Sequence, residues 1–222
     1  MKKNIFNFFF IFITIFVTAQ NKFKLPKNYN LVQELEGDLD NDGVAEKIIL
    51  ANTDVLLDGI DNANFKRELL IYKKKNSKYE IWKTGGDFLI SSRDGFYPDD
   101  NTIEIKVKKN VLTIHQKLYL NSKTTEIDHF TFRFQNNDLF LIGSRIYFQK
   151  NCDGEIVNEI NFSTGKCILK EDYEVCEDDS SVKTNSIYKE FIHKFTKLIS
   201  FREFISGQHS IKVPNTNKTI TY

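Results

Sequence analysis

The chain has 222 residues, a formal net charge of +1, 41% hydrophobic residues and 14% aromatic residues. This length suffices for one domain with a substantial core or for two small domains, and the hydrophobic content argues against disorder. The near-neutral charge argues against a nucleic-acid-binding protein, which would need a basic face.

The first nineteen residues have the layout of a secretory signal peptide. Lys2 and Lys3 precede an apolar run from Ile5 to Val17, and Ala19 ends a small-residue cleavage site. The run is shorter than the roughly 20 residues that span a bilayer as a helix, and no later segment predicts a transmembrane span. We therefore predict a signal peptide over residues 1–19 and a periplasmic or extracellular mature chain. An uncleaved membrane anchor is the alternative.

Most of the mature chain alternates between apolar and polar residues, which predicts β-strands. Short turns rich in Asn, Asp and Gly separate these segments, which favours hairpins and a meandering antiparallel arrangement. The predicted fold is mainly β, either propeller-blade-like or a sandwich, with a β domain over residues 20–170. The strands are expected at Leu31–Glu36, Glu46–Ala51, Arg67–Lys75, Lys78–Thr84, Thr102–Lys108, Val111–Leu120, Thr125–Phe134, Asp138–Gln149, Glu155–Phe162 and Lys166–Lys170.

Two longer irregular stretches, Asn52–Phe65 and Gly85–Asn101, are the expected binding surfaces. After residue 170 the pattern changes. An acidic connector at Glu177–Ser181 precedes apolar residues at helical spacing, which predicts an amphipathic helix over residues 187–205 that ends at Gly207. We expect residues 171–222 to pack this helix on the sheet. A helix that binds a partner or a second copy is the alternative.

Residues 38–46 carry the most informative motif, Asp-Leu-Asp-Asn-Asp-Gly-Val-Ala-Glu. Three aspartates at alternate positions followed by glycine are typical of a loop that wraps oxygen ligands around Ca²⁺. The expected ligands are the carboxylates of Asp38, Asp40 and Asp42, the carbonyl of Val44, and Glu46 directly or through water. We assign the predicted ion a structural role. An Asp/Asn/Gly turn without metal is the alternative.

The loop is not a complete EF-hand, because its twelfth position is Ile49 and its flanks predict strands. It resembles the calcium loops of FG-GAP and VCBS-type repeats, which lie between two strands. Together with Glu68–Tyr72, Thr131–Gly143 and Ser163–Lys166, it also resembles a group of small exported bacterial proteins of unsettled function. Some proteins of similar outline are periplasmic immunity factors that block peptidoglycan hydrolases. The resemblance covers residues 33–170.

Three cysteines lie close together in the sequence, at positions 152, 167 and 176. Because an exported protein meets an oxidising environment, an odd count suggests one disulfide and one free thiol. If residue 162 pairs with residue 167 across a hairpin, Cys152 lies close to Cys176, and Cys167 lies at the far end of the ribbon. We predict a Cys152–Cys176 disulfide and a buried, reduced Cys167, with three free thiols as the alternative.

No catalytic motif with a nucleophile, phosphate loop or zinc-protease spacing is present. Strand register predicts that His115 faces His129 on a solvated face, but a catalytic zinc site needs a third protein ligand. We therefore expect a non-enzymatic, calcium-stabilised exported protein that binds a protein or a cell-wall component. An inhibitor of a cell-wall hydrolase, recognised by a protruding Arg93 or Asp94, is the first alternative. A hydrolase, recognised by a cleft of carboxylates with raised pKa, is the second.

Overall fold

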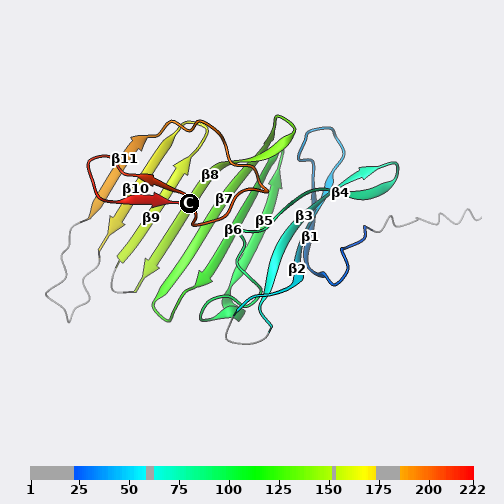
Figure 1. Cartoon of the computed structure of the whole chain (residues 1–222), viewed down its shortest axis with the longest axis horizontal. Coiled ribbons are helices and arrows are strands. Elements are labelled where there is room, and N and C mark those ends of the chain that lie inside the picture. Colours follow the sequence, from blue (N-terminus) through cyan, green and yellow to red (C-terminus); the bar gives the residue numbers. More distant parts are fainter. Residues whose placement is uncertain (1–22, 59–62, 152–153, 174–185) are drawn as a thin grey trace, which may run out of the picture.

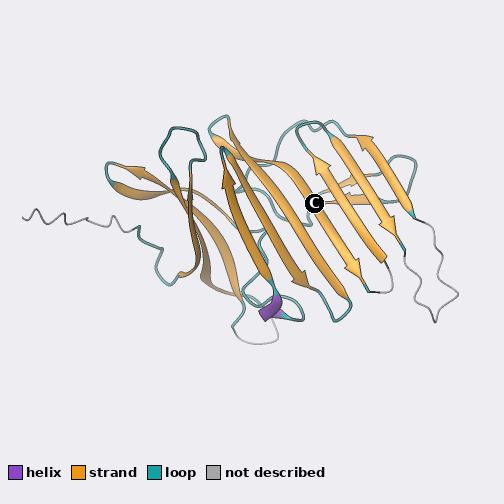
Figure 2. Ribbon diagram, turned by 180° about the vertical axis from the view of Figure 1, so that it is seen from behind, coloured by secondary structure: helices purple, strands orange, loops and turns teal. Residues whose placement is uncertain are grey.

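The computed structural model describes residues 23–58, 63–151, 154–173 and 186–222, so the predicted signal peptide lies outside the described residues. Two antiparallel meanders make up most of the fold, and within each of them strands adjacent in sequence pair with one another (Figures 1 and 2). One sheet has four strands and the other seven, which confirms a mainly β, meandering antiparallel architecture. The four-stranded sheet contains β1 (Asn30–Gly37), β2 (Glu46–Leu56), β3 (Phe65–Lys75) and β4 (Lys78–Gly85).

The seven-stranded sheet begins after a short 3₁₀ helix, η1 (Pro98–Asp100), and a separate two-stranded sheet follows it near the C-terminus. All ten predicted strands are present, and β2 extends beyond its predicted end. The larger sheet contains β5 (Thr102–Lys108), β6 (Val111–Tyr119), β7 (Thr124–Gln135), β8 (Asp138–Lys150), β9 (Gly154–Asn161), β10 (Lys166–Asp172) and β11 (Ile187–Ile192), and the small one β12 (Ser210–Lys212) and β13 (Thr219–Thr221).

Asparagine fixes several of the tight hairpins, as the sequence predicts. Asn76, Asn136 and Asn137 have positive φ angles of 48°, 48° and 63°. Asn tolerates this left-handed region better than most residues, so two-residue turns close between β3 and β4 and between β7 and β8. These turns set the register that places the functional side chains described below.

The larger of two apolar clusters joins the two sheets to the C-terminal segment. Its centre is Phe88, which comes from the Gly85–Asn101 stretch and not from a strand. The Phe88 ring lies 5.2 Å from the ring of Phe132 on β7 and 5.4 Å from that of Phe201. A long loop is therefore anchored by its own aromatic residue between the sheet and the C-terminal chain.

The predicted helix over residues 187–205 is wrong. Residues 187–192 form strand β11, which pairs with β10 from Lys166↔Ile192 to Glu171↔Ile187. No described residue between 193 and 222 is helical. The free edge of β10 offers backbone partners to this segment, which is rich in β-branched and aromatic residues.

The chain after β11 also follows a sheet edge instead of forming a helix. Leu141 N–H donates to the Ile199 carbonyl at 2.9 Å, and Phe201 N–H donates to the Leu139 carbonyl at 2.8 Å. Strand β9 pairs with β8 only from residue 143 onward, which leaves this part of β8 open. The apolar residues at helical spacing therefore belong to an extended chain that crosses the core.

The cysteine prediction is confirmed for one residue. Cys167 is a free, fully buried thiol, and burial raises its pKa to about 11. The predicted Cys152–Cys176 disulfide lies outside the described residues. The β9–β10 register differs from the predicted one, because Asn161 pairs with Lys166 where the prediction paired residues 162 and 167. The Asn161 side chain accepts hydrogen bonds from the amides of Ser163 and Thr164, and the turn begins one residue earlier than predicted.

Candidate metal-binding loop and a buried acidic pair

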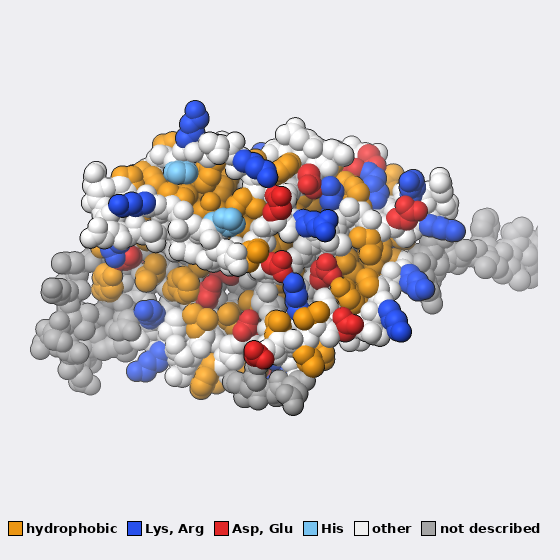
Figure 3. All heavy atoms as spheres, in the orientation of Figure 1, with side chains coloured by type: hydrophobic (Ala, Val, Ile, Leu, Met, Phe, Trp, Pro, Cys, Tyr) orange, Lys and Arg blue, Asp and Glu red, His pale blue; other side chains and the backbone are white. Residues whose placement is uncertain are grey.

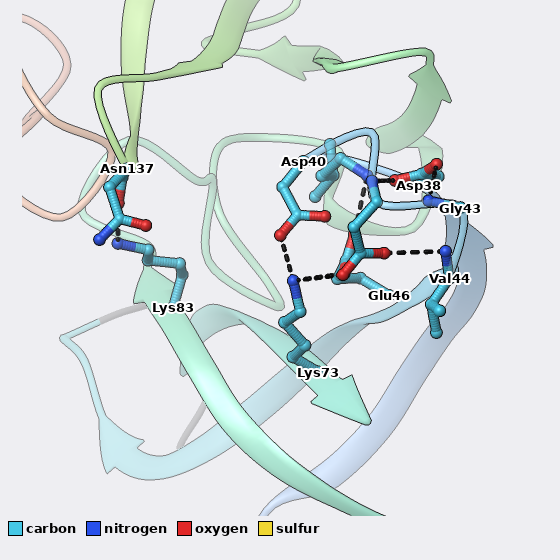
Figure 4. Close-up of polar contacts among 10 residues, drawn as sticks. Asp38, Asp40, Gly43, Val44, Glu46, Lys73, Lys83 and Asn137 are labelled. Atoms are coloured by element: carbon cyan, nitrogen blue, oxygen red, sulfur yellow. Dashed lines mark hydrogen bonds and ion pairs between the residues drawn. The ribbon is translucent and has the colours of Figure 1, made fainter. Parts of the chain in front are cut away.

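The predicted calcium loop connects β1 to β2 at one end of the four-stranded sheet (Figure 4). Leu39 is fully buried and anchors the loop in the core. Asn41 and Gly43 have φ angles of 58° and 83°, so the chain turns twice through the left-handed region. The sequence Asp-Asn-Asp-Gly therefore supplies both the carboxylates and the backbone freedom that curls them inward.

The three aspartates of the loop converge. Ligand oxygens of Asp38, Asp40 and Asp42 all lie within 4.8 Å of one another. Asp38 accepts hydrogen bonds from the amides of Asp42 at 3.2 Å and Gly43 at 3.0 Å, and Asp42 accepts one from Val44 at 2.8 Å. The described contact of Val44 is through its amide, so its carbonyl stays a predicted ligand.

Glu46 lies behind the loop and does not belong to the converging group of three aspartates. Its side chain is fully buried, and its Oε2 accepts a hydrogen bond from the Leu39 amide at 2.7 Å. Burial raises the pKa of Glu46, and the nearby carboxylate of Asp40 adds to this effect. Within the described chain, Glu46 Oε1 and Asp40 Oδ1 are buried oxygens without a hydrogen-bond partner. Such unsatisfied oxygens are the ligands that a hard cation takes.

Lys73 on β3 is the residue of this site that sequence reasoning missed. Its ammonium group contacts the Asp40 carboxylate, lies 2.8 Å from Asp42 Oδ2, and lies 3.8 Å from Glu46 Oε1. It also lies 5.1 Å from the centre of the Trp82 ring. No spacing rule connects Lys73 to the loop. Only the β2–β3 register, in which Lys47 faces Tyr72, brings it there.

Lys73 therefore acts as a counter-ion to the loop carboxylates. Although burial opposes it, hydrogen bonds to Asp40 and Asp42 raise the pKa of Lys73 above its usual value. The hydrogen bond from Lys73 in turn holds the pKa of Asp42 below its usual range. A metal ion in this loop would compete with the ammonium group for the same oxygens. The residues fit a hard divalent cation if Lys73 turns away.

A second acidic cluster, the Glu126–Asp128 pair, lies on the inner side of β7. Asp128 is 4% exposed, and burial raises its pKa to about 6. Burial and the neighbouring Asp128 carboxyl raise the pKa of Glu126 to about 7. Asp94 adds negative charge from the Gly85–Asn101 stretch. These two carboxyl groups therefore hold a proton near neutral pH.

Gln116 on β6 connects this acidic pair to the long loop. Its amide nitrogen donates to Asp128 Oδ2 and to the Phe88 carbonyl, each at 2.9 Å, and its oxygen accepts from the Ile90 amide at 3.1 Å. Gln116 is 2% exposed, so these bonds are protected from water. The Gly85–Asn101 stretch is thus held on the sheet by a buried hydrogen-bond network of Gln116, Asp128 and the backbone of residues 88 and 90.

The two residues proposed for an inhibitory contact do not protrude as predicted. The Arg93 guanidinium lies 3.1 Å from Asp99, and its amide donates to Asn64 at 2.9 Å. The Asp94 carboxylate accepts a hydrogen bond from Gly95 N–H at 2.9 Å, and its side chain is half-buried. The hydrophobic side chains that protrude from this stretch are Phe96 and Tyr97, which are 51% and 43% exposed, and the Asp99 side chain beside them is 86% exposed.

Comparison with known proteins provides no assignment: no protein-family model matches the chain, and no curated protein and no solved structure is significantly similar to it. The resemblance to calcium-loop repeats therefore stays a prediction. Among the described residues no helix is long and apolar enough to cross a membrane. On the face shown in Figure 3, acidic and basic side chains are interspersed.

Proposed function

We propose that this protein is an exported, calcium-stabilised, non-enzymatic binding protein. The observation that supports calcium is the convergence of three aspartates within 4.8 Å, beside buried oxygens of Asp40 and Glu46 that lack hydrogen bonds. Ca²⁺ takes six to eight oxygen ligands in flexible geometry, which a curled loop can supply, whereas Mg²⁺ prefers few protein ligands. The ion would fix the β1–β2 connection.

Calcium titration of the mature chain tests this site. At a Ca²⁺ concentration about 100 times Kd, binding should raise Tm by about 5–10 °C relative to EDTA. Asp40→Asn should remove most of this shift, whereas Asp100→Asn, a change of an exposed aspartate in η1, should leave it intact. A wild-type melting curve that is the same in EDTA and in millimolar Ca²⁺ contradicts the proposal.

The proposed partner surface is the aromatic group at the opposite end of the sheets. The Phe96 and Tyr97 rings are 4.7 Å apart at right angles, and Tyr97 lies 5.8 Å from Tyr119. The Phe96 amide donates to the Tyr119 carbonyl at 2.7 Å, so the loop is fixed before a partner arrives. Rigid, exposed aromatic side chains are typical of binding hot spots, on proteins and on sugars alike.

Binding assays on two materials separate the possible partners. Co-sedimentation with purified cell wall and affinity capture from envelope extract should each be compared between wild type and Phe96→Ala/Tyr97→Ala. The double change should abolish retention of the true partner, whereas Tyr188→Ala, at an exposed aromatic on β11, should not. Equal retention of wild type and both variants would show that Phe96 and Tyr97 do not bind the partner.

One observation favours the alternative of a hydrolase, namely the raised pKa values of Glu126 and Asp128. A catalytic pair must be reached by substrate, whereas Asp128 is 4% exposed and bonded to Gln116. We therefore place binding ahead of catalysis. Peptidoglycan hydrolysis that is lost in Glu126→Gln would reverse this order.

A further inference from the structure

Two histidines face each other on the outer side of the seven-stranded sheet. His115 on β6 and His129 on β7 are direct cross-strand partners. His115 Nδ1 lies 3.1 Å from His129 Nδ1 and 2.9 Å from His129 Nε2. In such a contact one nitrogen carries a hydrogen and the other offers a lone pair. A metal ion can replace that hydrogen and accept lone pairs from both rings.

The separation of the nitrogens is close to that of a zinc site. Tetrahedral Zn²⁺ with Zn–N bonds of about 2.0–2.1 Å requires two ligand nitrogens about 3.3 Å apart. The observed distances of 2.9 and 3.1 Å need only a slight separation of the rings. Both histidines are half-buried, so neighbouring strands restrain their orientation.

The next strand carries a carboxylate that must turn to reach the histidines, because among the described residues only Asp38, Asp40 and Asp42 form a group of three with ligand atoms within 4.8 Å of one another. Glu104 on β5 is the cross-strand partner of His115, so its side chain leaves the same face of the sheet. It lies 2.7 Å from Lys106, in an ion pair whose two side chains are 54% and 68% exposed. Exposed ion pairs contribute little to stability, so Glu104 can exchange Lys106 for a metal at low cost.

Charged side chains of both signs lie near the pair. Arg145 on β8 faces His129, and its guanidinium lies 3.8 Å from Glu159 on β9. Burial, His115 and Arg145 all lower the pKa of His129, which favours the neutral, ligating imidazole.

We propose that His115, His129 and Glu104 form a Zn²⁺-binding site on the outer face of the large sheet, with water as the fourth ligand. Imidazole nitrogens and a carboxylate are the donors that Zn²⁺ accepts, whereas the all-oxygen loop at residues 38–46 suits Ca²⁺. The site lies on β5, β6 and β7 and shares no residue with that loop. It is therefore independent of the proposed calcium function.

Zn²⁺ titration of the mature chain in millimolar Ca²⁺ tests the proposal by calorimetry. We expect one Zn²⁺ per chain. His115→Gln and His129→Gln should each weaken binding about 100-fold, and Glu104→Gln about tenfold, since loss of a supporting group costs roughly 10–100-fold in affinity. His193→Gln and His209→Gln are matched controls outside the pair and should change the affinity less than about twofold on the same scale.

Wild-type protein gives a readout that does not depend on the variants folding. In nitrogen-15 NMR, Zn²⁺ should shift the imidazole signals of His115 and His129 while those of His193 and His209 stay in place. The proposal is overturned if wild type binds no Zn²⁺ at micromolar concentrations. It is also overturned if the double variant His115→Gln/His129→Gln retains wild-type affinity, or if the control histidines respond equally.

Discussion

Two groups of carboxylates in this protein reduce the repulsion between neighbouring negative charges in different ways. In the loop at residues 38–46, three aspartates converge near a lysine ammonium group, and the hydrogen bond from Lys73 lowers the pKa of Asp42. In the Glu126–Asp128 pair, burial raises both pKa values towards neutrality. The loop aspartates pair with the Lys73 ammonium group. The Glu126–Asp128 pair instead retains a proton near neutral pH.

The difference follows from the surroundings and not from the residue types. The loop is at the surface, where Lys73 and solvent stabilise charge, whereas Asp128 lies under the Gly85–Asn101 stretch and accepts a hydrogen bond from the neutral amide of Gln116. A neutral amide stabilises a carboxylate less than a cation does, and burial disfavours the charged form. Of these two carboxylate groups, only the loop is therefore suited to a divalent ion.

The largest expected effect comes from removing the neutral partner of the buried pair. Gln116→Leu leaves the Phe88 carbonyl, the Ile90 amide and Asp128 Oδ2 without their hydrogen bonds. Each buried polar group left unpaired costs roughly 1–3 kcal/mol, so we expect a loss of about 3 kcal/mol in chemical denaturation. Gln149→Leu, at an exposed position on β8, should cost less than about 0.5 kcal/mol. Equal losses of stability in the two variants would show that the Gln116 hydrogen-bond network is not a distinct source of stability.

The pH dependence of stability is an effect of similar size. The folded pKa values of about 7 for Glu126 and about 6 for Asp128 lie above their ordinary values of 4.5 and 3.8. The folded state therefore binds protons more tightly than the unfolded state. Stability from this source is complete below about pH 4 and is lost as pH rises to about 7. Since one pKa unit corresponds to about 1.4 kcal/mol, we expect the free energy of unfolding to fall by several kcal/mol over this range.

A double variant isolates this pH dependence. Glu126→Gln/Asp128→Asn should flatten the stability profile between pH 4 and pH 7, measured by urea denaturation. Glu80→Gln, at an exposed position on β4, should keep the wild-type profile. If the double variant keeps the wild-type slope, the proton is held elsewhere and the contrast between the two carboxylate groups fails.

Lys73→Met tests the comparison at the aspartate loop. Without the ammonium group the loop carboxylates repel one another, so Tm in EDTA should fall by about 2 °C. Calcium affinity should rise about tenfold, because the ion no longer displaces a cation. Lys83→Met is a matched control, since Lys83 also lies over the Trp82 ring, at 5.5 Å, but pairs with Asp138. An unchanged calcium affinity in Lys73→Met would contradict competition for the same oxygens.

Local and distant arrangements differ in how well the sequence predicts them. The aspartate loop is predictable because its ligands lie within nine residues and its turn needs glycine at position 43. The facing of His115 and His129 follows from turn positions and strand alternation. Lys73 and Gln116 could not be assigned in this way, because register and a folded loop bring their partners close. The C-terminal segment was mispredicted because its apolar spacing suits a helix, while two open sheet edges offered extended pairing.

The smallest expected effect tests the most exposed loop aspartate. Asp42→Asn removes one carboxylate that faces Lys73, but Asp40 keeps its contact with the same ammonium group. In EDTA we therefore expect a Tm change below about 1 °C, since exposed ion pairs contribute little. Calcium affinity should nevertheless fall about tenfold, because a charged ligand is replaced by a neutral amide. Calorimetry and melting curves on one sample measure both. A large loss of Tm with unchanged calcium affinity would instead assign Asp42 to holding Lys73, and the loop would then resemble the buried pair in needing no ion.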